Sequence, residues 1–317
     1  MNHHSIAQQG VIWADLSARG CLHLTERDRL DLIHRMSTGN LAALQAGQAA
    51  ETVLTTPIGR IIDLVTVLHA GEEAFAITGA GRGEAIYGYL RRNIFFNDRI
   101  RVTLLGAETR LLGLYGQAAA ATLARALPAA AELPLLHFIE VDGVRVLQVK
   151  PLPADGAGYW LLGAPEAVAA WQARLAPEAP VADPATLELL RIEAGHPGTQ
   201  AELTEDYIPL EAGLWDAVSF NKGCYTGQEI IARMESRGKL AKLLVRLQAT
   251  EALARGEDLY HEQQKVGQVT SVAQHPDGHH LALGFVKPVA AAASTLYTAQ
   301  QTSVALLGIA GTQPERS

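Results

Sequence analysis

The stretch "SFNKGCYTGQEIIARM" (residues 219–234) separates two kinds of sequence and contains Cys224, one of two cysteines among the 317 residues. Before it, segments with helical and strand-like periodicity are mixed. After Met234 the segments are short and strand-like with turns between them, which predicts a small antiparallel β-barrel. We therefore expect an α+β region of two subdomains over residues 1–235 and a barrel domain over residues 236–317.

The mixed order of the earlier elements favours α+β layers over a doubly wound parallel sheet. The apolar spacing in "TERDRLDLIHRMSTGNLAAL" (25–44) predicts a helix with Thr25 as its N-cap. The stretch "RIIDLVTVLHAGEEAFAITG" (60–79) predicts two strands joined by a turn at Gly71. The Asp-Gly pair at 142–143 is a strong hairpin signal.

The composition argues against several classes of protein. The formal net charge is −7, which gives no overall electrostatic attraction for nucleic acid. No stretch approaches the roughly 20 apolar residues needed to span a bilayer, and the N-terminus lacks the pattern of a secretory signal. Two cysteines provide no disulfide framework, so a reducing cytoplasm is the simplest expectation.

Local chemistry around Cys224 predicts a reactive thiol. Thr226 followed by Glu229 is a capping-box pattern, which would start a helix two residues after Cys224. The helix amides, the cation of Lys222 and a sharp turn at Gly223 would then favour the thiolate form. A thiolate attacks electrophiles or binds soft metals and iron–sulfur species. The alternative, a cysteine packed as a small hydrophobic residue, stays open.

The other potential metal ligands fit structural roles better. Cys21 stands among small and apolar residues, and a Cys21–His23 pair lacks further ligands nearby. His275, His279 and His280 flank a Pro-Asp-Gly turn, where exposure to solvent is expected. We therefore predict no resident metal site.

The stretch "LRRNIFFNDR" (90–99) mixes basic and aromatic residues. Such a mixture is typical of surfaces that bind single-stranded nucleic acid. Because the net charge is negative, we instead expect Phe95 or Phe96 to pack the end of a helix.

The cysteine stretch also carries a family resemblance. "KGCYTGQE" (222–229) resembles the K-G-C-Y-x-G-Q-E signature of the YgfZ family of folate-binding proteins, which are related to the aminomethyltransferase T-protein of glycine cleavage. "RIEAGHPGTQAEL" (191–203) and "YIPLEAGL" (207–214) are similar to the family's R-I-E-A-G and I-P-L-E-A-G-L segments. "GFVKP" (284–288) resembles part of its C-terminal barrel, so the resemblance covers most of the chain.

The resemblance implies a T-protein-like multi-domain fold around a central folate channel, with a C-terminal antiparallel β-barrel. It implies tetrahydrofolate or a derivative as the cofactor. In the YgfZ family the associated role is iron–sulfur cluster assembly or repair, which serves radical enzymes that thiolate tRNA. The implied partners are iron–sulfur enzymes or assembly proteins, and a monomer is the default state.

Every specified position of the K-G-C-Y-x-G-Q-E signature is matched by the same residue type in this sequence. The resemblance implies that Cys224 is the reactive group and that Lys222 stabilises its anion. The rest of the motif would fix the shape of the loop: Gly223, Tyr225, Gly227, Gln228 and Glu229.

Two departures from T-protein argue against a true aminomethyltransferase. T-protein has an Asp-Asp pair on a strand, whereas here Asp63 is followed by Leu64. T-protein also has a G-Y-E pattern whose glutamate contacts the pterin, whereas here Trp160 stands at the glutamate position. Trp160 is expected either to stack on a pterin or to fill the core.

Further residues could contact a folate, although a structural role is favoured for each of them. Arg60 stands where it could meet the glutamyl tail of a folate, or it is a solvated strand-end arginine. Glu193 and Glu211 could line a polar cavity, or they could cap helices or pair with Arg191.

Three functions are therefore open. The first, which the retained signature favours, is a folate-binding accessory protein for iron–sulfur clusters that uses Cys224. The second is a folate-dependent aminomethyl or one-carbon transferase. The third is an interaction module that binds no ligand.

Overall fold

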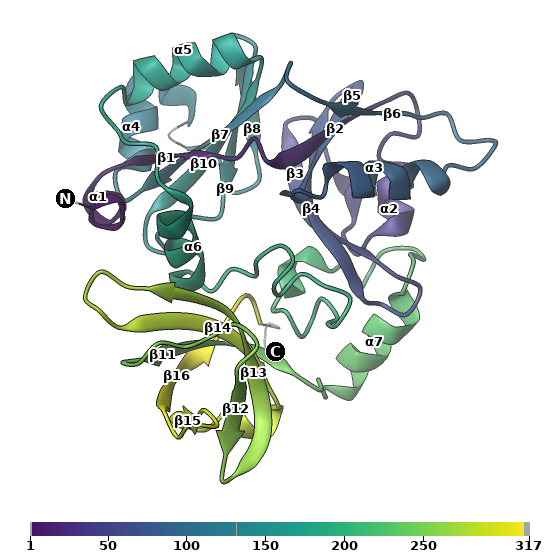
Figure 1. The fold of residues 1–317 in the computed structure, drawn as a ribbon. Helices are drawn as coiled ribbons and strands as arrows, with labels where there is room; N and C mark the ends of the chain where they lie inside the picture. Colours follow the sequence, from purple (N-terminus) through teal and green to yellow (C-terminus); the bar gives the residue numbers. More distant parts are fainter. Residues whose placement is uncertain (1, 131, 314–317) are drawn as a thin grey trace. The chain divides into compact units, whose positions relative to one another are not determined.

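The part of the chain before the cysteine stretch contains two five-stranded sheets in the computed structural model, which describes residues 2–130 and 132–313 (Figure 1). The first sheet is antiparallel throughout, with the order β1 (Ile12–Asp15), β7 (Arg110–Gly116), β10 (Ala157–Gly163), β9 (Val144–Val149) and β8 (Phe138–Val141). The second has the order β3 (Gln48–Thr55), β4 (Ile61–Ala70), β5 (Glu73–Ala80), β2 (Arg19–Thr25) and β6 (Arg101–Leu105).

The chain divides into two compact units that do not follow its linear order. The first unit comprises the described residues up to Leu54 together with Asp63–Asp183 and Asn221–Thr226, so the segment around Cys224 belongs to it. The second comprises Thr55–Ile62, Pro184–Phe220 and the described residues from Gly227 onward.

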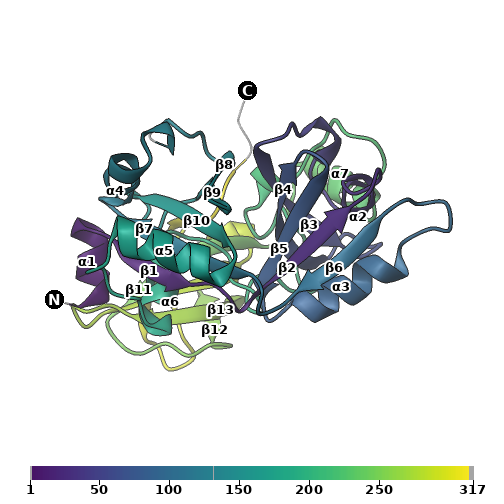
Figure 2. The same cartoon turned by 90° about the horizontal axis from the view of Figure 1, so that it is seen from above.

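Helices cover the first sheet on the face of its apolar core. Helix α5 (Pro165–Leu175) begins at a proline, whose missing N–H is tolerated in the first turn. It buries Val168, Trp171 and Leu175, and it lies against β7 and β10 (Figure 2). Helices α1 (His3–Gln9) and α4 (Ala119–Ala126) also contact this sheet.

The predicted hairpins are confirmed. Strands β4 and β5 pair antiparallel from Ala70 and Glu73 across the Gly71 turn, where the backbone φ is 76°. Strands β8 and β9 turn at residues 142–143, which both have positive φ. Asn, Asp and Gly favour this conformation in two-residue hairpin turns.

The helix predicted over residues 25–44 is shorter than expected. Helix α2 spans Asp31–Met36 and is followed by the 3₁₀ turn η1 (Leu41–Ala43). The N-cap prediction for Thr25 is wrong, because Thr25 is the last residue of β2 and pairs there with β5 and β6.

The prediction that phenylalanines pack the end of the next helix is also wrong. Helix α3 (Gly83–Arg92) lies along β2, β5 and β6 and buries Ile86 and Leu90 (Figure 2). Phe95 and Phe96 follow the helix and are 61% and 104% exposed. The contact face of the helix is already filled by its own aliphatic residues.

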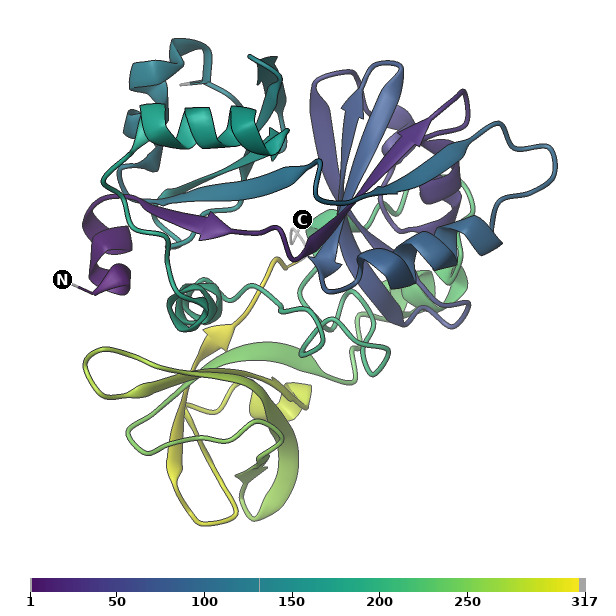
Figure 3. The same ribbon diagram turned by 45° about the horizontal axis from the view of Figure 1, so that its top comes forward.

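The second unit contains the predicted β-barrel, which is confirmed as a closed, six-stranded antiparallel structure (Figure 3). Its interior is lined by aliphatic side chains such as Val245, Leu259 and Val304. The strands follow the order β11 (Leu243–Ala249), β14 (His280–Val286), β13 (Gln264–Gln274), β12 (Asp258–His261), β15 (Thr295–Tyr297) and β16 (Ser303–Ile309).

Two helices precede the barrel in the second unit, α6 (Pro184–Glu193) and α7 (Gln228–Arg237). Shorter 3₁₀ turns complete the chain: η2 (Pro128–Ala130), η3 (Trp215–Ala217) and η4 (Pro288–Ala290). Among the described residues, none of the helices has the length and hydropathy needed to cross a bilayer.

Candidate functional site

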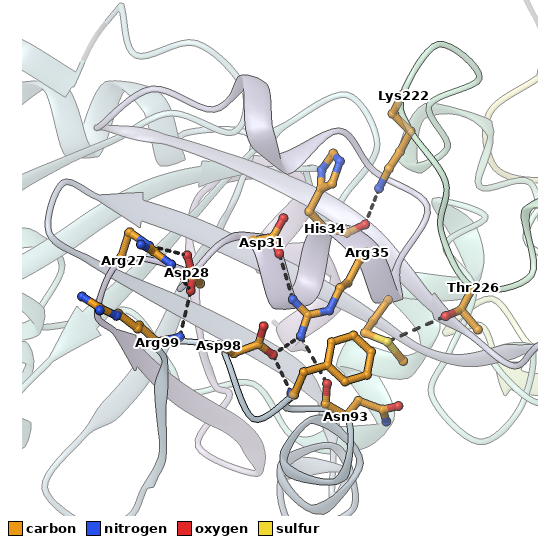
Figure 4. Close-up of polar contacts among 12 residues, drawn as sticks. Arg27, Asp28, Asp31, His34, Arg35, Asn93, Asp98, Arg99, Lys222 and Thr226 are labelled. Carbon is orange, nitrogen blue, oxygen red and sulfur yellow. Dashed lines mark hydrogen bonds and ion pairs between the residues drawn. The ribbon is translucent and has the colours of Figure 1, made fainter.

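Lys222 fastens one end of the cysteine loop, which we define as residues 221–226. Its ammonium donates a hydrogen bond to the carbonyl oxygen of His34 at 2.5 Å, near the C-terminal end of α2 (Figure 4). It also donates to the carbonyl oxygens of Ser37 (2.8 Å) and Gly39 (2.7 Å), just beyond the helix. Burial lowers the pKa of Lys222 from its ordinary range to about 8. Carbonyl groups at a helix C-terminus favour a cation, so the ammonium satisfies groups that the helix leaves unpaired.

Thr226 fastens the other end of the cysteine loop to the same helix. Its backbone N–H donates to the carbonyl oxygen of Arg35 at 3.1 Å, and its hydroxyl contacts the sulfur of Met36 at 3.7 Å (Figure 4). The loop is therefore held at both ends by polar contacts with α2.

The capping-box prediction is wrong. The N-cap of α7 is Gly227, whose left-handed φ of 84° and close contact with Thr56 exclude a side chain. Thr226 does not cap the helix but bonds to α2 through its backbone N–H. Glu229 does not reach back to Thr226 but pairs with Arg233 at 3.0 Å on the surface of α7. Cys224 consequently lies three residues before the N-cap, not two.

The loop leaves the thiol accessible. Cys224 is exposed, as is Gly223 before it. Tyr225 is buried, with the nitrogen of Lys222 5.0 Å from its ring centroid, and burial raises the pKa of its phenol to about 12. The ring thus anchors the loop as a neutral group, and Gln228 begins α7 just beyond it. The role of Lys222 in stabilising a thiolate stays a prediction, since its ammonium is directed at the carbonyl groups of α2.

Asp63 lies in the interior of the same unit, on β4. Only 1% of it is exposed, and one carboxylate oxygen accepts the backbone N–H of Gly79 at 2.9 Å. The other oxygen, Oδ1, has no hydrogen-bond partner among the described residues. Burial raises the pKa of Asp63, while the N–H of Gly79, the charges of Arg82 and Arg19, and the N–H of Leu64 act in the opposite direction. A buried carboxylate with a free acceptor is suited to bind a ligand that supplies N–H or O–H donors.

Trp160 lies on β10 and is 6% exposed. Its indole N–H donates to the hydroxyl oxygen of Tyr115 at 2.7 Å, and the guanidinium carbon of Arg19 lies 5.0 Å from its ring centroid. Burial also raises the pKa of Tyr115. These contacts support the core role for Trp160, while its stacking on a pterin stays a prediction.

The structure thus assembles a group that we call the interior cluster: Asp63, Arg19, Trp160 and Tyr115. Sequence reasoning missed Arg19 and Tyr115, because neither stands in a recognisable motif. Arg19 links the cluster, since it acts electrostatically on both Asp63 and Tyr115 and covers Trp160.

Arg60 and Glu211 lie near each other in the second unit. The guanidinium of Arg60 donates to the carbonyl oxygen of Asp206 at 3.0 Å and lies 3.9 Å from the carboxylate of Glu211. Glu211 is 5% exposed and accepts the N–H of Ile208 at 3.2 Å. Both side chains are therefore used in holding this segment, and their contacts with a folate stay predictions.

Glu193 lies elsewhere in the second unit, with its carboxylate 3.5 Å from the Nε2 of His275. The other ring nitrogen of His275 accepts the N–H of Asp277 at 3.2 Å, so protein groups already occupy both nitrogens. The alternative pairing with Arg191 is not observed for Glu193 or Glu211. Arg191 instead pairs with Glu188 and with Glu202, a fully buried acid that the sequence did not identify.

The comparisons with known proteins define the class. The sequence profile described as the GCVT N-terminal domain matches residues 1–222. The chain therefore belongs to this family, that of the aminomethyltransferase T-protein.

Relatives match over most of the chain. A chloroplastic protein of Arabidopsis thaliana, provisionally described as a transferase, is 30% identical over 301 residues, which cover 91% of this chain and 68% of the relative. The aminomethyltransferase of Shouchella clausii is 28% identical, over 92% of this chain and 83% of its own length. The crystal structure of aminomethyltransferase T from Bartonella henselae superposes with a TM-score of 0.84 at 21% identity, covering 98% of this chain and 88% of that one. The predicted T-protein-like fold is thus confirmed.

Proposed function

We propose that the chain is a YgfZ-type member of this family, a folate-binding accessory protein that supports the assembly or repair of iron–sulfur clusters through the thiol of Cys224. The observation that carries the proposal is the exposed Cys224 within a loop that Lys222 and Thr226 fasten to α2. We further propose that the protein is a cytoplasmic monomer. Its partners would be iron–sulfur enzymes or their assembly proteins, and it would not bind nucleic acid directly.

The chemistry of Cys224 follows from its setting. A single thiolate is a soft ligand, and it attacks sulfur or carbon electrophiles. One sulfur cannot enclose a metal by itself, so the bond to sulfur, iron or a one-carbon group is transient. The anchored loop keeps the sulfur at the surface, where a client protein has access to it.

The proposed folate site centres on Asp63. The pterin ring of a tetrahydrofolate carries N–H donors, and the Oδ1 of Asp63 is an acceptor without a described partner. Arg19 and Trp160 would line the same site. Folate supplies one-carbon chemistry when bound, while the residues of this chain bind the ring and orient it.

The second candidate is an aminomethyl or one-carbon transferase. It is favoured by the retained Asp63, whose pKa is raised by burial as is typical of a group that handles protons. It is disfavoured by Leu64 and Trp160, which stand where T-protein has acids. Glycine-cleavage turnover with tetrahydrofolate and the aminomethylated carrier protein separates the two, because robust turnover would establish the transferase.

The test of the first candidate is Cys224→Ser, with Cys21→Ser as the matched control. Cys21 is buried, and burial raises the pKa of its thiol to about 12, so this thiol stays protonated and is not expected to react. We expect Cys224→Ser to fold normally and to lose complementation of a strain defective in iron–sulfur repair, whereas Cys21→Ser complements. Full complementation by Cys224→Ser would show that the motif is structural.

Calorimetry with reduced folates tests the cofactor. Binding at micromolar ligand that is weakened in Asp63→Asn supports the folate site. Absence of binding at high micromolar ligand would instead favour the interaction module that binds no ligand.

A further inference from the structure

The turn after α3 exposes two adjacent phenylalanines. Phe96 is fully exposed, Phe95 is 61% exposed, and large apolar groups in such positions mark interaction sites when they gather on one surface. The turn itself is ordered by Asp98, whose carboxylate accepts the N–H of Phe95 at 2.7 Å and pairs with Arg35 (Figure 4). The phenylalanines are therefore held in place outside the core.

Exposed arginines stand on either side of these phenylalanines in the sequence. Arg91, Arg92, Arg99 and Arg101 are all exposed, and within the described chain none of their guanidinium groups has a carboxylate partner. The nearest acid in sequence, Asp98, is already engaged with Arg35. This local excess of cations stands out in a chain with a net charge of −7.

Arg35 connects this turn to the cysteine loop. Its guanidinium carbon lies 4.8 Å from the ring centroid of Phe95, and its carbonyl oxygen accepts the N–H of Thr226. Cys224 is two residues before Thr226, so the thiol and the phenylalanines lie within about 25 Å of each other. A standard interface covers about 800 Å² on each partner, a patch about 30 Å across, and can therefore include both.

We propose that Phe95, Phe96, Arg91 and Arg92 form a docking surface for an acidic segment of a client protein, whose reactive group is thereby delivered to Cys224. The proposal rests on the thiol role of Cys224 proposed above and adds the chemistry of the partner. Phenylalanine and arginine are typical anchors of protein interfaces, and carboxylates complement the arginines. A protein partner is favoured over nucleic acid because the two exposed phenylalanines are apolar anchors of the kind that protein interfaces use, and because the thiol role proposed for Cys224 needs a reactive group on the client.

The experiment uses three synthetic peptides, each with one leucine and one cysteine carried as a pyridyl disulfide, among Glu, Gln or Lys residues. The thiolate of Cys224 attacks the peptide sulfur, a mixed disulfide forms, and pyridine-2-thione leaves with the electron pair of the broken S–S bond. We expect the Glu peptide to react about 10-fold faster than the Gln peptide at low salt, and the Lys peptide more slowly. The differences shrink as salt is added.

Variants locate the effect. Arg91→Glu combined with Arg92→Glu should reverse the order of the peptides, whereas Arg125→Glu, a reversal on the exposed face of α4, should preserve it. Phe96→Ser should slow the Glu peptide about 3-fold. The matched control is Val289→Ser, which alters a residue that is 76% exposed on the barrel and should have no effect.

Three outcomes would overturn the proposal: equal rates for the three peptides, tighter binding of a single-stranded oligonucleotide than of the Glu peptide, or self-association that Phe96→Ser abolishes. Fluorescence anisotropy of labelled peptides with Cys224→Ser measures docking without thiol chemistry. An inert Cys224 with a retained preference for the Glu peptide would therefore count against the proposed function while supporting the docking surface.

Discussion

The cysteine loop and the interior cluster belong to the same unit but differ in the exposure of their functional atoms. The loop exposes the atom proposed to react, the sulfur of Cys224, while Tyr225 is buried and Lys222 is partly buried beneath it. The cluster buries its potentially reactive atom, the Oδ1 of Asp63, and leaves it without a described partner. An exposed group on a rigid support is suited to meet a large partner, whereas an unsatisfied buried group is suited to a small ligand that excludes water.

A single substitution should destabilise the protein more in the cysteine loop than in the interior cluster, because one side chain, Lys222, binds three carbonyl groups. We expect Lys222→Met to lower the free energy of unfolding by about 3 kcal/mol, because three hydrogen bonds from a charged donor are lost in a partly buried place. The loop should also loosen, which changes the alkylation rate of Cys224. Urea unfolding and the rate of reaction with iodoacetamide measure the two effects.

The control is Lys239→Met, which removes an exposed lysine and should change the free energy of unfolding by less than about 0.5 kcal/mol. If both variants are equally stable, the three carbonyl contacts carry no net stability. The contrast between a loop fixed by polar contacts and a buried carboxylate oxygen without a described partner would then be lost.

Local signals in the sequence predicted much of the fold. The Asp-Gly pair at 142–143 and Gly71 predicted hairpins because turn conformations depend on the turn residues themselves. The change of pattern after Met234 predicted the barrel. The domain boundary at residue 235 remains a prediction.

The site could be predicted only as far as its motif. The carbonyl groups that hold Lys222 stand 183 to 188 residues earlier in the chain, a pairing that no spacing rule indicates. Thr226 and Glu229 matched a capping box, but the left-handed Gly227 took the cap position. The partnership of Arg19 with Trp160 is likewise a product of tertiary packing.

The interior cluster provides the second test, through Trp160→Phe. We expect the free energy of unfolding to fall by about 2 kcal/mol, because the buried hydroxyl of Tyr115 loses its indole partner. Pairing the change with Tyr115→Phe should reveal a coupling energy of about 1 kcal/mol. Folate affinity should change less than 3-fold if the tryptophan serves the core. A stable variant that no longer binds folate would instead make Trp160 a platform for the pterin.

The smallest expected effect has the opposite sign and concerns Asp63. Because burial raises its pKa in the folded state, the folded protein binds more protons than the unfolded chain above the ordinary aspartate pKa of about 3.9. The contribution of Asp63 to stability is thus fully present below that pH and is lost as pH rises through the raised value. We expect Asp63→Asn, which can still accept the N–H of Gly79, to be more stable than the wild type by about 1 kcal/mol at neutral pH. The difference should disappear near pH 4, as followed by urea unfolding at both pH values.

The same substitution should weaken the binding of reduced folates, because an amide cannot replace both acceptor oxygens. A gain in stability combined with a loss of affinity is the pattern of a residue kept for its ligand at a cost to the fold. Asp155→Asn, at an exposed position in the same unit, should change neither quantity. If Asp63→Asn instead destabilises the protein at neutral pH and leaves folate affinity intact, Asp63 is a structural acid whose free oxygen binds ordered water, and the small-ligand interpretation of the interior cluster is wrong.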